Sequence, residues 1–214
     1  SESKTTTTTP DVTQLRIDNE KTNFQKVANF NQVFGVDRYA TPQPNIFKEN
    51  PKLVELRLNL IREEVREFEE ACENHDMVEA VDALADILYV VYGAGDCFGI
   101  DLDEAYQTVH SSNMTKICSS EEEAQETVEW YKQNKLDVYD TPAYKSAENG
   151  QHWIVYNQST GKVLKSINYL PAQLKKYCEP REPEHYPSET ITRPESMPPV
   201  TEIVAPQCQR PIKK

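Results

Sequence analysis

The fold is decided by the stretch LRLNLIREEVREFEEACENHDMVEAVDALADILYVVYG (residues 56–93). Apolar residues recur every three or four positions on both sides of its polar centre, which is the period of an α-helix. Asn74 and Asp76 can end one helix and cap the next. The stretch therefore predicts two consecutive helices joined by a short turn. They carry Glu63, Glu64 and Glu67 on the first helix and Glu79, Asp82 and Asp86 on the second.

The acids of the second helix stand out because this helix is otherwise almost wholly apolar. From Ala80 to Gly95, Asp82 and Asp86 are the only charged residues. A carboxylate in an apolar face needs a compensating partner, since burying an unpaired charge is costly. Carboxylate oxygens are ligands that Mg²⁺ and Mn²⁺ accept. We therefore expect a divalent metal ion at these residues.

The spacing of the acids permits a shared site. On a helix that turns about 100° per residue, Glu64 and Glu67 fall on one face, and the three acids of the second helix fall within about 60°. If the helices pack antiparallel, both sets can converge on one cavity. The competing interpretation is a solvated face with local arginine pairs on the first helix. For Glu79, it is a favourable interaction with the helix dipole.

The whole pattern predicts an all-α core, a helical bundle, with a C-terminal acidic helix and a small β-hairpin extension. Core helices are expected over residues 22–34, over about 20 residues from Leu53, over residues 77–93 and over residues 102–113. The acidic helix, from Ser120 to about Asn134, is expected to be peripheral. Two β-rich runs, residues 152–156 and 162–167, predict the hairpin.

Composition divides the chain into four segments. Residues 1–21 contain a threonine run and no aromatic residue, which predicts a flexible arm. Residues 22–118 form the predicted helical domain, and residues 119–178 form the extension with the acidic helix and the hairpin. Residues 179–214 are rich in proline and predict an extended tail.

The net charge and the cysteine spacing indicate what the protein binds and in which compartment it is expected. The formal net charge of −12 argues against non-specific binding to nucleic acid, which depends on basic patches. The five cysteines are widely spaced and include no Cys-x-x-Cys pair, which favours a reducing compartment. No apolar run is long enough for a membrane span or resembles a secretory leader. These features predict a soluble intracellular protein, in the cytoplasm or an organellar matrix.

Several blocks in this order carry a family resemblance. They are residues 56–67, DALADILY (82–89), VVYG (90–93), FGID (98–101) and HSSNMTK (110–116). Together they resemble the all-α nucleotide pyrophosphohydrolase superfamily, specifically its MazG-like and phosphoribosyl-ATP pyrophosphohydrolase-like branch. The resemblance implies Mg²⁺-dependent hydrolysis of a nucleoside triphosphate between the α and β phosphates, with Mn²⁺ as a possible substitute. The products would be the monophosphate and diphosphate.

The resemblance also assigns roles to the acids. The family's Glu-Glu-x-x-Glu motif implies that Glu64 and Glu67 bind metal and that Glu63 orients or deprotonates the attacking water. The family's second motif, Glu-x-x-Asp, fits this sequence in two registers. The two readings are Glu79 with Asp82, and Asp86 with Ala83 in the place of the glutamate. All three acids of the second helix remain metal-ligand candidates.

Three further residues are predicted to bind the substrate. Asn113 can donate and accept hydrogen bonds and so can read a base edge, and Lys116 can place a positive charge on a phosphate. Without the resemblance, these two residues would be interpreted as a helix C-cap and an exposed lysine. Arg57, in the first block, is the third candidate.

Two functions remain open. The first is removal of non-standard or surplus (d)NTPs by a homodimer or homotetramer, since relatives complete their bundles between chains. The second is a catalytically reduced subunit with a structural role in a larger assembly, which would bind a protein partner through its hairpin and tails. The surviving acids favour the first function, whereas the extension and Ala83 favour the second.

Overall fold

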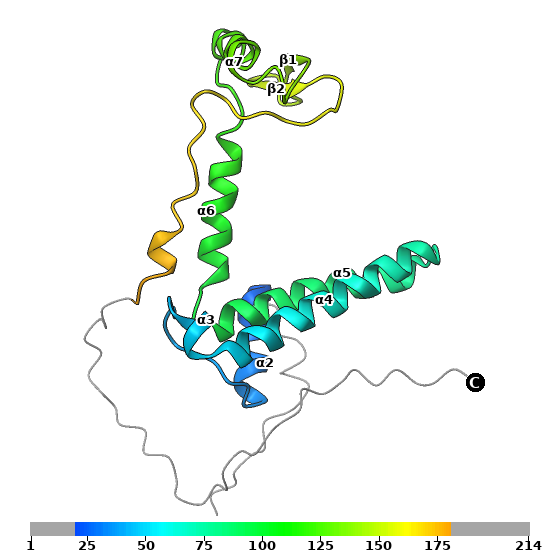
Figure 1. The fold of residues 1–214 in the computed structure, drawn as a ribbon, viewed down its shortest axis with the longest axis vertical. Coiled ribbons are helices and arrows are strands. Elements are labelled where there is room, and N and C mark those ends of the chain that lie inside the picture. The colour runs from blue at the N-terminus through cyan, green and yellow to red at the C-terminus, as the bar shows by residue number, and fades with distance from the viewer. Residues whose placement is uncertain (1–19, 181–214) are drawn as a thin grey trace, which may run out of the picture. The chain divides into compact units, whose positions relative to one another are not determined.

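The computed structural model describes residues 20–180 (Figure 1). The predicted arm over residues 1–21 and the predicted tail over residues 179–214 lie almost wholly outside this range. Contacts within the chain divide the described residues into two compact units, residues 20–99 and Ile100–Glu179. This division falls just before the fourth predicted helix, which is therefore grouped with the extension.

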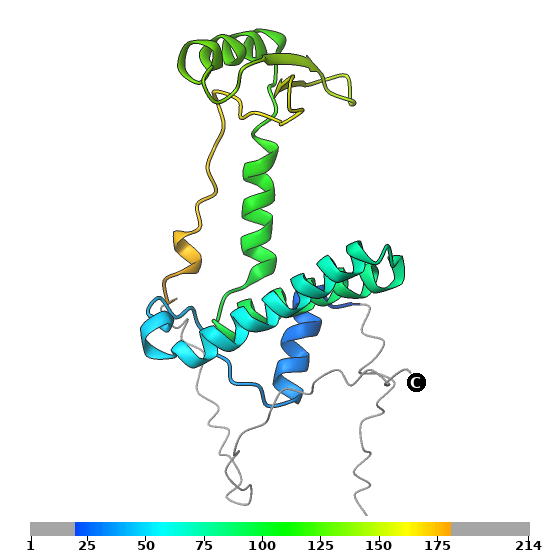
Figure 2. The same ribbon diagram turned by 45° about the vertical axis from the view of Figure 1, so that its right-hand side comes forward.

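The first unit is built on a helical hairpin. α4 (Pro51–Glu73) begins with a proline, whose missing N–H would be unpaired there in any case, and Asn50 caps its first turn. α5 (Met77–Cys97) begins after Asp76, whose carboxylate accepts hydrogen bonds from two N–H groups of the first turn. The two helices lie side by side and antiparallel (Figures 1 and 2). The predicted all-α core is confirmed.

A third helix, α2 (Asn23–Val33), packs against α5. Its buried Asn31 donates a hydrogen bond from Nδ2 to Oδ2 of Asp96 at 2.9 Å. Arg38, which follows the helix, donates to both oxygens of the same carboxylate at 2.7 and 3.0 Å. The buried Asp96 therefore ties α2 and the segment after it to the C-terminal end of α5.

The connection between α2 and α4 lies against the end of α5. It contains the short helix α3 (Ile46–Glu49), whose first residue packs with the buried Leu53 and Cys97. Gly99 has a φ of +74°, and a Cβ built on it would lie 2.0 Å from the carbonyl oxygen of Thr41. This position needs glycine both for its backbone conformation and for the close approach of the connection.

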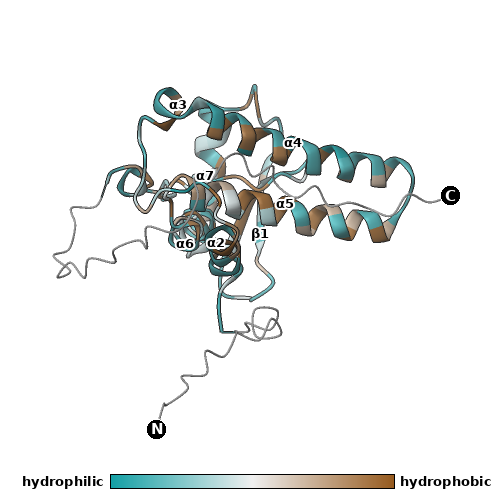
Figure 3. Ribbon diagram, turned by 90° about the horizontal axis from the view of Figure 1, so that it is seen from below, coloured by the Kyte–Doolittle hydropathy of each residue, from teal (hydrophilic) through white to brown (hydrophobic). Residues whose placement is uncertain are grey.

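Hydrophobic residues recur along α5, where they appear brown in Figure 3. Some of them face solvent in a row that we call the outer apolar row: Val81, Leu84, Leu88 and Val91. Successive members are three or four residues apart, so they share one side of the helix. Among residues 20–180, no single helix has the length and apolar character to cross a membrane, although α5 passes that test as a bent pair with the next helix.

The second unit begins with α6 (Leu102–Met114), which is capped by the side chain of Asp101. Residues 168–178, which we call the strap, lie beside this helix (Figures 1 and 2). The hydroxyl of Ser112 donates to the carbonyl of Leu170 at 2.7 Å. Near the other end, the Tyr177 hydroxyl donates to the carbonyl of Glu104 at 3.1 Å. Contacts at both ends therefore hold the strap along α6.

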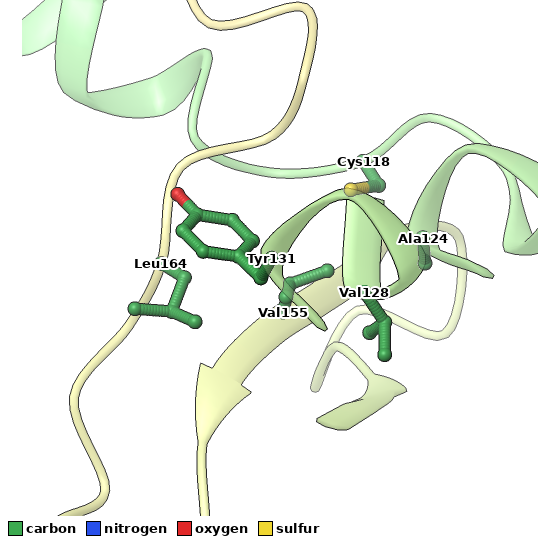
Figure 4. Packing of buried hydrophobic residues seen from close by; sticks show 6 residues of the cluster. All are labelled: Cys118, Ala124, Val128, Tyr131, Val155 and Leu164. Carbon is green, nitrogen blue, oxygen red and sulfur yellow. The ribbon is translucent and has the colours of Figure 1, made fainter. Parts of the chain in front are cut away.

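The remainder of the second unit has its own core. α7 (Glu121–Asn134) packs against a hairpin of β1 (Pro142–Ser146) and β2 (Trp153–Asn157). Figure 4 shows six buried side chains of this core: Cys118, Ala124, Val128, Tyr131, Val155 and Leu164. The acidic helix is expected to be peripheral to the helical bundle, and it does belong to the other unit. It is not peripheral within that unit, because Ala124, Val128 and Tyr131 of its inner side form the centre of this core.

The hairpin has a different partner from the predicted one. β2 corresponds to the predicted run 152–156, but it pairs with β1, and residues 162–167 contribute only an isolated bridge at Val163. β1 has the sequence PAYKS, which has little intrinsic β preference. Its pairing is supported by packing, since the rings of Tyr144 and Trp153 meet edge-on with centroids 5.8 Å apart.

Residues 165–167 bind side chains of α7 in place of a strand. The Tyr131 hydroxyl donates to the Lys165 carbonyl at 3.0 Å and accepts from the Lys165 N–H at 3.1 Å. The Ile167 N–H donates to Oγ1 of Thr127 at 3.2 Å, and the Ser166 hydroxyl donates to Glu123 at 2.5 Å. We call this set of side chains, spaced four residues apart on one side of α7, the α7 clamp: Glu123, Thr127 and Tyr131.

The α7 clamp predicts a pH dependence for the second unit. Burial raises the pKa of Glu123, but hydrogen bonds from Ser166, the Ser119 N–H and Asn168 outweigh burial, so its pKa lies below the ordinary value of 4.5. A carboxylate whose pKa is lower in the folded state stabilises the fold above its unfolded-state pKa, and this contribution is lost as the pH falls through the folded-state value. The unit should therefore lose stability progressively below about pH 4.5.

Tryptophan fluorescence can measure this loss. The two tryptophans of the chain, Trp130 and Trp153, both lie in the second unit, so their emission follows its unfolding. Thermal unfolding from pH 7 to pH 3 should show a smaller pH dependence in Glu123→Gln than in the parent. An equal dependence in both proteins would show that this carboxylate does not stabilise the fold.

Candidate metal and nucleotide site

The three acids of the Glu-Glu-x-x-Glu motif lie on different sides of α4. Glu64 and Glu67 are half-buried, whereas Glu63 is exposed. The Oε2 atom of Glu64 is shielded from solvent. The buried Ala71 lies four residues after Glu67, so helical geometry places both on the same side. Glu64 and Glu67 therefore belong to the inner side of α4, and Glu63 belongs to its solvent side.

α5 makes a similar distinction between its three acids. Glu79 and Asp86 are half-buried, and Ala83 between them is only 1% exposed. Asp82 is exposed. The two registers of the second motif therefore differ physically. Ala83 and Asp86 both lie on the inner side of α5, whereas Glu79 and Asp82 are divided between its inner and outer sides.

Asp86 also influences the next turn of its helix. Burial, and then the charge of Asp86, raise the pKa of the Tyr89 phenol. The Tyr89 ring meets Phe30 of α2 edge-on, with centroids 5.6 Å apart. The Asp86 carboxylate therefore lies close to the aromatic contact between α2 and α5.

Glu67 and Glu79 reach a common hollow at the turn between α4 and α5. It has a volume of about 380 Å³ and is lined by Glu67, Glu70, Ala71, Asn74, Asp76 and Glu79. Glu64 and Asp86 are not among its lining residues. Over residues 20–180, no group of three or more His, Cys, Asp or Glu side chains is arranged to hold a metal ion. The described part of one chain thus brings two predicted ligands to one hollow but does not assemble a complete ligand set.

The chemistry of the inner acids fits a hard divalent cation. They offer carboxylate oxygens, which Mg²⁺ and Mn²⁺ accept as ligands. They are also partly removed from water, where negative charge needs compensation. Both conditions are met by Glu64, Glu67, Glu79 and Asp86. The exposed Asp82 meets only the first condition.

Arg57 occupies the interior of the first unit. Its side chain is 9% exposed, and its Nε has no hydrogen-bond partner among the described residues. Gly93 makes room for it, because a Cβ there would lie 3.3 Å from Nη1 of Arg57. A guanidinium in this position is poorly placed to meet dissolved substrate. Its burial favours a role inside the helical packing over the predicted contact with substrate.

The other two substrate-binding candidates belong to the second unit. Asn113 is exposed in the last turn of α6, and Lys116 follows the helix end and is half-buried. The C-cap residue is Thr115, so Asn113 does not cap the helix. The carbonyl of Lys116 accepts a hydrogen bond from the Ser166 N–H at 3.2 Å. The structure therefore places Lys116 beside Ser166 of the extension and Asn113 in the helical turn just before it.

The sequence analysis missed Asp96, the residue that organises the end of α5. Its buried carboxylate joins Asn31 and Arg38, which are 65 and 58 residues away in the chain. The available signal was an acid directly after an apolar helix, in the run Gly93-Ala-Gly-Asp96. That signal indicates a partnered acid but does not reveal its partners, because both come from distant segments.

Comparison with known proteins agrees with this arrangement. The sequence profile of the family described as phosphoribosyl-ATP pyrophosphohydrolase matches residues 27–113, which extend from α2 to the last turn of α6. The chain is also 30% identical to an uncharacterized protein of Acanthamoeba polyphaga mimivirus, in an alignment that covers 68% of this chain and 91% of the relative. The family description names a pyrophosphohydrolase of a nucleotide, so a nucleotide pyrophosphohydrolase type of function is supported. The chain belongs to the phosphoribosyl-ATP pyrophosphohydrolase family, within the MazG-like all-α nucleotide pyrophosphohydrolase superfamily.

Proposed function

We infer that the protein is a Mg²⁺-dependent nucleoside triphosphate pyrophosphohydrolase. It would convert a (d)NTP and water into the (d)NMP and diphosphate, and so remove non-standard or surplus nucleotides. The observation that carries this proposal is the inward direction of Glu64, Glu67 and Asp86 on the α4–α5 hairpin, within the segment matched by the family. Exposed acids on the outside of a helix would not support it.

The roles of the residues follow from their positions. Glu64, Glu67 and Asp86 would hold Mg²⁺, with Glu79 as a further ligand at the hollow that it shares with Glu67. Bound Mg²⁺ would neutralise phosphate charge and lower the pKa of a coordinated water. Glu63, on the solvent side of α4, can orient or deprotonate only a water that approaches from that side. Asn113 and Lys116 would bind the base and a phosphate.

A second function is favoured by one specific observation. Ala83 is buried on the inner side of α5, at the place where the Asp86 register expects a glutamate. One ligand would then be missing, and the chain would serve as a catalytically reduced subunit in a larger assembly. It would bind its protein partner through the extension or the tails.

The outer apolar row of α5 supports self-association. Val81 is 60% exposed and Leu88 is 54% exposed. A contiguous exposed apolar surface of this kind usually marks a contact with another protein. We therefore propose a homodimer or homotetramer in which this row is covered. A second copy could also contribute ligands to the metal site, for which the described residues of one chain provide no group of three.

The proposed function is tested by pyrophosphate release from a panel of NTPs, dNTPs and phosphoribosyl-ATP. The purified full chain would be assayed with Mg²⁺, with Mn²⁺ and with excess EDTA. We expect release from at least one nucleoside triphosphate with either metal and none with EDTA. Cleavage of phosphoribosyl-ATP alone would reassign the substrate. No release from any nucleotide would favour the catalytically reduced subunit.

A further inference from the structure

The extension leaves α6 and returns to the same point. Cys118 and Trp153 exchange two backbone hydrogen bonds, at 2.8 and 3.0 Å, and the Ser166 N–H reaches the Lys116 carbonyl at 3.2 Å. Residues 119–165 are therefore an excursion whose two ends meet just after α6. Residues that are separated by about 50 positions in the sequence become neighbours there.

The α7 clamp fixes the returning end of this excursion. Tyr131 binds both the N–H and the carbonyl of Lys165, and Thr127, which is fully buried, binds the backbone of Ile167. Backbone groups held from both directions have little freedom to move. The clamp therefore determines where the Lys165 side chain leaves the backbone.

The strap then carries the chain onto the last turn of α6. The Leu170 N–H donates to Oγ1 of Thr115 at 2.9 Å, and the Ser112 hydroxyl lies 3.1 Å from the Tyr169 hydroxyl. Nζ of Lys165 lies over the Tyr169 ring, 4.6 Å from its centroid. The ammonium of Lys165 is therefore held near the last turn of α6, which carries Asn113 and is followed by Lys116.

The local charge is unusual for this chain. Neither Lys116 nor Lys165 forms a salt bridge with an acid within residues 20–180. The chain as a whole carries a formal charge of −12, so acids are abundant elsewhere. The nearest carboxylate that the hydrogen bonds place here is Glu123, which accepts from the Ser166 hydroxyl and from the Ser119 N–H and forms no salt bridge with either lysine. The backbone segments of Lys116 and Lys165 meet at this point, next to an amide that can read a base, and together they form a surface suited to an anionic ligand.

We propose that Lys165 binds the phosphate chain of the nucleotide together with Lys116, and that the α7 clamp and the strap are the device that positions it. This inference rests on the proposed function, and it assigns the extension a role in binding the nucleotide. Lysine supplies a point charge on a flexible stem, so the clamped backbone and the Tyr169 ring provide the orientation that the side chain lacks.

The decisive variant is Lys165→Met, which keeps most of the stem and removes the charge. It should raise KM for the cleaved nucleotide about tenfold, because a charge-assisted contact in a partly exposed position is lost. The kcat should stay within about twofold, since the reacting bond is not touched. Lys165→Arg should recover at least half of the loss in affinity. An unchanged KM in Lys165→Met would overturn the inference.

The chain offers a matched control in Lys145. Its Nζ also lies over a tyrosine ring, that of Tyr156 at 4.9 Å, but Lys145 belongs to β1 and not to the segment that meets the chain just after α6. Lys145→Met removes the same charge and the same kind of aromatic contact from the same unit. It should leave KM unchanged. An equal increase in KM in both variants would show that the loss of one positive charge anywhere in the unit weakens binding. That result would overturn the inference.

The positioning role requires its own readout. Tyr131→Phe removes the hydroxyl that binds the Lys165 backbone while keeping the buried ring. It should raise KM in the parent background and have little further effect in Lys165→Met, because both changes act through the same lysine. Additive effects of the two substitutions would contradict positioning by the α7 clamp.

Binding of inorganic tripolyphosphate separates this inference from the proposed function. Calorimetry with Mg²⁺ measures phosphate binding without any turnover. If the parent releases no pyrophosphate but binds tripolyphosphate more tightly than Lys165→Met, the hydrolase proposal fails and the Lys165 site stands. If the parent hydrolyses nucleotides and both proteins bind tripolyphosphate equally, the hydrolase stands and the Lys165 site fails. Absence of binding in the parent also overturns the site.

Discussion

Glu64→Gln should lower Mg²⁺-dependent pyrophosphate release about 100-fold or more, because it removes a metal ligand from the inner side of α4. The substitution keeps the size of the side chain and removes its charge. Secondary structure and Trp130 fluorescence should therefore match the parent. The measurement is kcat/KM for the best nucleotide of the panel, with Mg²⁺ near saturation.

Two comparisons make this prediction specific. Glu69→Gln makes the same change at an exposed position of α4 and should leave kcat/KM within about twofold of the parent. On α5, Asp86→Asn should reproduce the loss seen in Glu64→Gln, whereas Asp82→Asn should retain most activity, because Asp82 faces solvent. Equal losses of activity in Asp82→Asn and Asp86→Asn would show that the side of α5 on which an acid lies does not identify the metal ligands.

Gly99→Ala should give the largest loss of stability in the first unit. A Cβ at this position would meet the Thr41 carbonyl oxygen at 2.0 Å and its carbon at 2.3 Å, and the residue has a φ of +74°. The conformational and packing penalties together should lower the free energy of unfolding by about 2–5 kcal/mol. Urea unfolding followed by helical circular dichroism measures this change.

Gly35 provides the control for the packing part of that loss. It has a φ of +66°, but a Cβ there would meet nothing within 4 Å. Gly35→Ala should therefore cost only the conformational penalty, about 1–2 kcal/mol. Neither substitution should alter the fluorescence of Trp130 and Trp153, which lie in the other unit. Equal losses of unfolding free energy in both variants would show that the segment around Thr41 moves away from the new Cβ at no cost.

Capping residues made the helices predictable. Asp76, Asp101 and Ser120 are local signals, and each precedes the observed first residue of its helix. Apolar periodicity then supplied the helix length, although α5 continues to Cys97, beyond the expected end at Gly93. Glycine near the end of a helix does not stop it when the surrounding packing favours helix.

The hairpin partner was not predictable from the same kind of signal. The β-rich run 162–167 is a better strand by composition than PAYKS, yet the latter forms β1. Side-chain groups of Thr127 and Tyr131 take the backbone hydrogen bonds of residues 165 and 167. The β propensity of residues 162–167 therefore stabilises a strand less than these hydrogen bonds stabilise the observed structure. The hydrogen bonds come from a helix more than 30 residues earlier in the chain.

The sequence by itself determined the candidate acids, the α4–α5 hairpin and the family, because motif spacing and capping are properties of adjacent residues. The tertiary structure alone decided which acids face inward, since only about 40° of rotation about the helix axis separates the exposed Asp82 from the half-buried Asp86. It also decided that Lys165 meets the end of α6, because the α7 clamp and the strap join segments about 50 residues apart. Long-range contacts of this kind leave no local pattern in the chain.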